Sequence, residues 1–136
     1  MDGPDARSSS RLRHAMAFAL RVHREAGVLV AEASGRASLA DLCGMASLVG
    51  TTTGLTGERR ALLHLLGVDI DLSFTEHLQL GSFVAQQLQH LERVASVVPE
   101  RYRTGTSEKA AQKGGLRFRT FTDVPQGLAW VTDEGD

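Results

Sequence analysis

The chain has 136 residues, about the length of one domain, and 42% of them are hydrophobic and 23% charged, which argues against a disordered, fibrous or membrane-spanning protein. Fifteen basic and sixteen acidic side chains give a formal net charge of -1, so no positive field attracts nucleic acid or an anionic membrane. The single cysteine, Cys43, excludes an intramolecular disulfide framework and fits a reducing compartment, so we expect a cytoplasmic protein.

We expect the chain to begin with a short disordered tail. Residues 1–14 are polar and include Gly3, Pro4 and a run of three serines, a composition typical of unstructured termini. They lack the apolar core of a secretory signal, and no later stretch has the roughly 20 apolar residues of a membrane span. A single folded domain is predicted for residues 15–136.

An antiparallel hairpin is predicted next. Phe18, Leu20 and Val22 alternate with other residues in the period-two pattern of a strand with one buried face. A short turn separates this strand from a second apolar run over residues 28–33, which we expect to end at Gly35. So short a turn makes the two strands antiparallel neighbours.

A helix and a central strand follow the hairpin. Ser38 and Asp41 resemble a capping box with the shorter acid, and apolar residues repeat at helical spacing up to Val49. The glycine- and threonine-rich stretch 50–57 predicts a loop that ends this helix. The nearly continuous apolar run 61–66 is typical of a strand covered on both faces.

The cycle of strand and helix then repeats. Ser73 and Glu76 form a full capping box before a helix whose apolar stripe runs to Leu91. The remaining predicted elements are a strand at 94–98, a helix at 107–113, a strand at 116–120 and a last helix that Asp123 caps, with Pro125 in its first turn. Strands alternating with helices imply an α/β fold: about five strands in a mixed, largely parallel sheet, with about four helices.

This organisation resembles the SpoIIAA-like (STAS-related) domains of bacterial anti-sigma-factor antagonists. The resemblance covers most of the chain and is carried by residues 28–35 with 38–42, and by 118–123 with 129–131, which include Trp130. It implies a SpoIIAA-like fold with an N-terminal antiparallel hairpin, and it implies no enzyme activity. Fold-level patterns of this kind are specific for architecture and weak for function.

Signalling members of this family carry a phosphorylatable serine at the start of the helix after the central strand, next to an aspartate. Ser73 stands near that position, but Leu72 separates it from Asp71 and no glycine follows. Ser73 also has a sufficient structural role, because its hydroxyl can cap the helix by accepting a bond from the Glu76 amide. Ser73 and Asp71 are therefore candidates for a phosphorylation or partner-contact site, with capping alone as the alternative.

A second candidate site lies after the strand at 94–98. Arg101, Arg103, Gly105, Thr106 and Ser107 come at the opening of a helix. Backbone amides at a helix start, with hydroxyls and two arginines nearby, could hold a phosphate or carboxylate at the carboxyl edge of the sheet. The alternative is a threonine that caps the helix while the arginines stay in water.

The remaining residues and motifs argue mainly against metal, enzyme and cofactor sites. The five histidines lack the spacing of a metal site. We expect His77 in solvent, and His64, inside an apolar strand, must find a hydrogen-bond partner or lose its charge. A nucleophile elbow, a P-loop and a dinucleotide fingerprint are all missing, so we expect no enzyme, metal or cofactor. Phe121 is either covered by the last helix or part of a contact surface.

The sequence thus favours a non-catalytic domain that binds a protein partner, or a second copy of itself as a homodimer, in a regulatory setting. The alternative is a carrier of a small or lipid-type ligand held between helices and sheet, which requires a pocket of several hundred cubic ångströms, on the order of 300 Å³ or more. An enzyme is the third hypothesis, and it rests only on the proximity of His64, Asp69 and Asp71 in the sequence.

Overall fold

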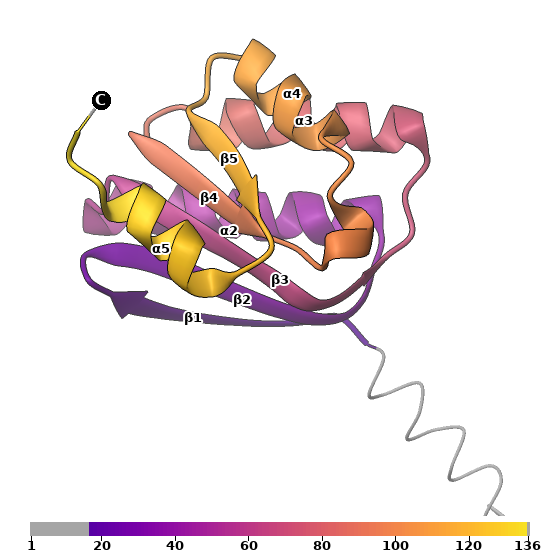
Figure 1. Ribbon diagram of the computed structural model, residues 1–136, viewed down its shortest axis with the longest axis horizontal. Helices are drawn as coiled ribbons and strands as arrows, with labels where there is room; N and C mark the ends of the chain where they lie inside the picture. Colours follow the sequence, from indigo (N-terminus) through magenta and orange to yellow (C-terminus); the bar gives the residue numbers. More distant parts are fainter. Residues whose placement is uncertain (1–16, 136) are drawn as a thin grey trace, which may run out of the picture.

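The computed structural model describes residues 17–135, and in this part of the chain five strands lie side by side in the order of the sequence (Figure 1). The strands are β1 (Ala19–Glu25), β2 (Val28–Ala37), β3 (Arg60–Ile70), β4 (Arg93–Val97) and β5 (Phe118–Phe121). β1 pairs antiparallel with β2, and all other neighbours are parallel. This confirms the predicted mixed sheet. The tail expected at 1–14 lies outside the described residues.

Helices cover both faces of the sheet (Figure 1). The helical elements are α2 (Leu39–Thr56), α3 (Phe74–Leu88), the short 3₁₀ helix η1 (Glu100–Tyr102), α4 (Thr106–Lys113) and α5 (Val124–Thr132). α2, α3 and α4 pack over the larger hydrophobic core, and α5 covers a smaller one on the opposite face. All five residues of β4 are buried, as expected for a parallel strand between two layers.

Three side-chain caps place the helix starts where the sequence predicts them. In α2 the Asp41 amide donates to the Ser38 hydroxyl at 3.2 Å, and the Asp41 carboxylate accepts from the Ser38 amide. α3 has the same reciprocal box between Ser73 and Glu76. Asp123 caps α5 by accepting from the Gln126 amide at 3.0 Å. Each cap satisfies amides that lack a partner within their own helix.

The predicted loop at 50–57 is wrong, because α2 continues to Thr56 and ends at Gly57, whose φ of +88° gives a left-handed cap. A side chain at Gly50 would place its Cβ 2.6 Å from the Gln87 carbonyl oxygen of α3. Gly50 therefore lies where α2 and α3 are in close contact. The burial of this part of α2 outweighs the low helix propensity of glycine. Thr53 is buried there, and its hydroxyl donates to the Val49 carbonyl at 2.7 Å.

Two predictions about strands also need correction. β2 passes through Gly35, at a φ of +92°, and continues to Ala37; the pairing with β3 continues on both sides of an irregularity between Glu32 and Ser34. β1 is more exposed than its alternation predicts, since Val22 is in contact with solvent. Of the two alternatives for Phe121, coverage by the last helix is the observed one, with ring centroids of Phe121 and Trp130 5.8 Å apart.

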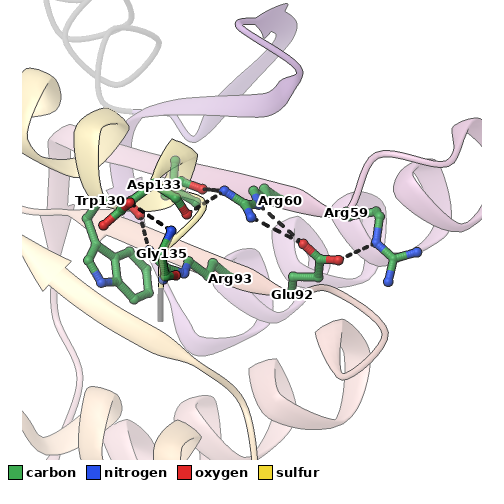
Figure 2. Close-up of polar contacts among 8 residues, drawn as sticks. Arg59, Arg60, Glu92, Arg93, Trp130, Asp133 and Gly135 are labelled. Atoms are coloured by element: carbon green, nitrogen blue, oxygen red, sulfur yellow. Dashed lines mark hydrogen bonds and ion pairs between the residues drawn. The ribbon is translucent and has the colours of Figure 1, made fainter.

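Arginines on the first residues of two strands hold the end of α5 (Figure 2). The Arg93 guanidinium is buried and donates to the carbonyls of Trp130 at 2.6 Å and Gly135 at 2.5 Å. Arg60 donates to the carbonyls of Val131 and Asp133 at 2.9 and 2.8 Å. Cations are favourable at the negative end of the helix dipole, and these bonds give donors to carbonyls in and just after the last turn of α5, where the Trp130 carbonyl also accepts from the Asp133 amide.

Candidate functional site

The carboxyl ends of the parallel strands meet the first turns of α3 and α4 at one edge of the sheet. From β3, Asp69 accepts a 2.7 Å hydrogen bond from the Tyr102 hydroxyl of η1. From the first turn of α3, His77 Nδ1 lies 2.9 Å from the Ser107 hydroxyl of α4. These two contacts connect segments about 30 residues apart in the chain, at the edge where open parallel sheets commonly bind ligands.

The sequence predicted that His77 lies in solvent. This prediction is wrong, because the side chain is half-buried. Burial lowers the pKa of its imidazole, and the charge of Glu76 opposes this effect. The ring is covered because α4 packs closely against α3: a Cβ at Gly81 would lie 2.5 Å from the Ser107 carbonyl oxygen and 2.6 Å from the Ala110 Cβ. The glycine in α3 thus brings α4 near enough for His77 to reach Ser107.

A partly open cavity of about 70 Å³ lies beside this contact, between α2, α3, α4 and the sheet. Its walls are mainly aliphatic, and its polar lining includes His77, Ser96, Tyr102, Ser107 and Glu108. A cavity needs about 10–15 Å³ to hold one water, so there is room for a few waters. Ligand pockets for drug-sized molecules are larger, about 300–1,000 Å³.

The Asp71–Ser73 turn lies at the surface. Asp71 and Ser73 are both exposed, and the Ser73 hydroxyl accepts the capping bond from the Glu76 amide at 3.2 Å. The capping role predicted for Ser73 is therefore present. The next residue, Phe74, is 67% exposed, and Leu78, one helical turn further, is 39% exposed. Two large apolar side chains thus lie in solvent beside the candidate phosphorylation site.

Phe74 and Leu78 form one rim of an open groove between α3 and α4, which we call the α3–α4 groove. Lys109 and Lys113 of α4 lie along the other rim. Small residues lie where the helices touch; a Cβ at Gly114 would be 2.7 Å from the Ala85 Cβ. Glycines and alanines at this contact let the backbones of α3 and α4 approach closely. Their short side chains do not fill the groove.

The candidate anion-binding residues are divided among different contacts. The Arg101 guanidinium lies over the Tyr102 ring, 4.6 Å from its centroid. Gly105 caps α4 in the left-handed conformation, at a φ of +83°. The Thr106 amide faces the Thr104 hydroxyl at 3.5 Å, and the Ser107 hydroxyl bonds His77. Arg103 is exposed. Anion binding at this loop stays a prediction.

The sequence alone does not indicate that His77 and Tyr102 meet other residues at this edge. The available signal was a histidine in the first turn after a capping box, in a helix that follows a parallel strand. His64 is half-buried in β3, and its Nδ1 has no hydrogen-bond partner among residues 17–135. Its predicted partner is therefore not found at that nitrogen.

Two further observations concern residues 17–135. None of their helices is long and apolar enough to cross a membrane. They contain no group of three or more His, Cys, Asp or Glu side chains placed to hold a metal ion.

Comparison with known proteins gives a class of fold. No family model matches the sequence, and no curated protein matches it. A crystal structure of an anti-sigma factor antagonist from Mycobacterium paratuberculosis is similar over 98% of this chain and 100% of that one, with a TM-score of 0.62 and 12% identity. The chain also resembles an uncharacterized DUF3478-family protein with a SpoIIAA-like fold from Shewanella loihica PV-4, with a TM-score of 0.54 and 22% identity, over 85% of this chain and 93% of that one. The chain therefore has a SpoIIAA-like (STAS-related) fold.

Proposed function

We propose that this chain is a non-catalytic SpoIIAA-like domain that regulates by binding a protein partner through the start of α3. The observation that carries the proposal is the exposure of Phe74, 67% in solvent, directly after the Ser73 cap. A Phe and a Leu exposed side by side are typical of a surface that another molecule covers. The fold neighbour described as an anti-sigma factor antagonist supports a regulatory role of the same kind.

Ser73 is the candidate switch of this surface, and phosphorylation there would act on binding directly. A phosphate adds a charge of about -2, and the positive end of the α3 dipole would tolerate it. The same charge would lie next to Phe74, where an apolar contact excludes water. Phosphorylated Ser73 would therefore bind an apolar or acidic partner more weakly than the free hydroxyl.

The cavity size favours partner binding over the carrier hypothesis. A carrier needs several hundred cubic ångströms inside the domain, on the order of 300 Å³ or more. The partly open cavity beside the sheet has about 70 Å³. Its space suits ordered water, since Ser96, His77 and Ser107 supply polar partners around it.

Capture of the partner with matched variants tests the proposal. The full chain, its Phe74→Ser variant and its Leu55→Ser variant are each used as bait in the cells that produce the protein, and the retained proteins are quantified by mass spectrometry. Leu55 is a suitable control because it is even more exposed, at 83%, but lies near the end of α2. A partner lost with Phe74→Ser and kept with Leu55→Ser supports the proposal.

The purified partner is then mixed with the purified chain to show direct binding. A partner that binds all three baits equally places the interface elsewhere and contradicts the proposal. The mass of each bait in solution, measured by light scattering, detects a homodimer. A dimer that only Phe74→Ser dissociates would make a second copy the partner of this surface.

A further inference from the structure

We infer that the α3–α4 groove receives an acidic amphipathic helix of the partner protein. This inference rests on the proposed function, because it names the element that would occupy the same surface. It depends on the shape of the groove, on the spacing of its rims and on its charge.

The shape and spacing of the groove fit a helix. Helices pack at axial distances of about 8–10 Å, and a groove with small residues at its floor lets a third helix approach two others closely. Phe74 and Leu78 are four residues apart on α3, and Lys109 and Lys113 are four apart on α4. Each rim therefore offers two side chains about 6 Å apart along its axis, the spacing at which a docked helix presents residues i and i+4.

The charge of the groove is of one sign. Among the described residues that line it, the charged ones are Lys109 and Lys113, and neither forms an ion pair within residues 17–135. The nearby acidic side chains are engaged elsewhere: Glu76 accepts from the Ser73 amide, and Glu108 accepts from the Thr120 amide. A partner helix with acidic residues beside its apolar stripe would complement both rims.

A second copy of this chain is a poor match for that chemistry. Among the α-helices formed by residues 17–135, α2 has one acidic residue, Asp41, which bonds Ser38, and α5 has none. α3 and α4 carry one each, Glu76 and Glu108. An anionic membrane is also a poor match, because such surfaces are read by about 4–8 clustered basic residues, and the groove offers two.

The test is a titration of the full chain, labelled with nitrogen-15, by two helical peptides and recorded as amide chemical shifts. The first probe is an acetylated, amidated 14-residue peptide with leucines on one face and glutamates on the flanking positions. The second has lysine in place of every glutamate. We expect the glutamate peptide to shift amides of α3 and α4 and to bind at least about tenfold more tightly than the lysine peptide at low salt. This preference should weaken as salt rises.

Charge reversal makes the test specific. The double variant Lys109→Glu, Lys113→Glu changes two exposed side chains and should reverse the preference between the peptides. Equal binding of both peptides, shifts outside α3 and α4, or an unchanged preference in the double variant would overturn the inference. A second result would also overturn the inference: the chain binds vesicles of 70% phosphatidylcholine and 30% phosphatidylglycerol, the double variant does not, and neither peptide binds.

The two levels of the proposal can fail separately. If Phe74→Ser abolishes partner capture but neither peptide binds, the helix inference is wrong and the proposed function stands. If the glutamate peptide binds the groove as expected and no partner depends on Phe74, the groove has the inferred chemistry and the proposed function is wrong.

Discussion

His77 and Ser107 connect the first turn of α3 to the first turn of α4, with imidazole Nδ1 and the hydroxyl Oγ 2.9 Å apart. Both residues line the partly open cavity, and the contact lies close to the α3–α4 groove, whose lining includes Phe74 and Gly105. It therefore holds in place the two helices that form the proposed binding surface. Changes at this contact, at Gly81 and at the Ser73 cap should each have a measurable effect on the stability of the protein.

His77 should titrate at a pH below the ordinary histidine value of 6.5, because burial lowers its pKa. The unfolded chain then binds a proton at His77 at a higher pH than the folded chain does. The stability contributed by neutral His77 is full above about pH 6.5 and is lost as the pH falls from there toward the folded pKa. Titration of the imidazole carbon-bound protons by NMR measures this, and a midpoint at or above 6.5 would contradict it.

Gly81→Ala should destabilise the protein by about 1–3 kcal/mol, because the new Cβ must push α4 away from α3. The matched control is Gly44→Ala in α2, where nothing lies within 4 Å of the added Cβ. That change should raise stability by up to about 1 kcal/mol through helix propensity. Urea unfolding of the three proteins measures both effects. Equal free energies of unfolding for the two variants would show that α3 and α4 are not in close contact.

Ser73→Ala should lower stability by about 1 kcal/mol, because the Glu76 amide loses its acceptor. Ser38→Ala is the matched control at the start of α2 and should cost a similar amount. Ser73→Asp keeps a capping oxygen and should restore most of the stability. Thermal and urea unfolding give the values. A fully stable Ser73→Ala variant would remove the structural role and leave binding or modification as the reason for this serine.

Arg93→Met should destabilise the protein by about 2–4 kcal/mol, because it leaves the carbonyls of Trp130 and Gly135 without their charged donor. It also removes the guanidinium that lies 5.0 Å from the centroid of the Trp130 ring. Hydrogen exchange should accelerate in α5 more than in α2, and the fluorescence of Trp130, the single tryptophan, should report the same loss. Arg117→Met, at an exposed position, is the control. Unchanged exchange in α5 would show that Arg93 does not hold the helix.

Local hydrogen bonding explains what could be predicted of the fold. The caps at Ser38, Ser73 and Asp123 join residues three apart, so a short stretch of sequence contains both partners. The apolar run in β3 likewise indicates burial on both faces at residues 61–63, although Leu66 at its end is exposed. From such local signals the order of strands and helices and the mixed sheet follow without the tertiary structure, whereas the SpoIIAA-like class rests on the resemblance and on the fold comparison.

The rest depended on contacts between distant residues. Gly50 predicts a loop by its composition, and only the Gln87 carbonyl facing it explains why it lies inside a helix. His77 and Ser107 become partners only when Gly81 lets α4 approach α3. The same approach brings residues of α3 such as Phe74 and residues of α4 such as Lys109 together to line one groove. The sequence by itself determined the order of the elements and three of their caps, because those interactions are local. The tertiary structure decided the site and the length of α2, because a glycine or a histidine acquires its role from what packs against it.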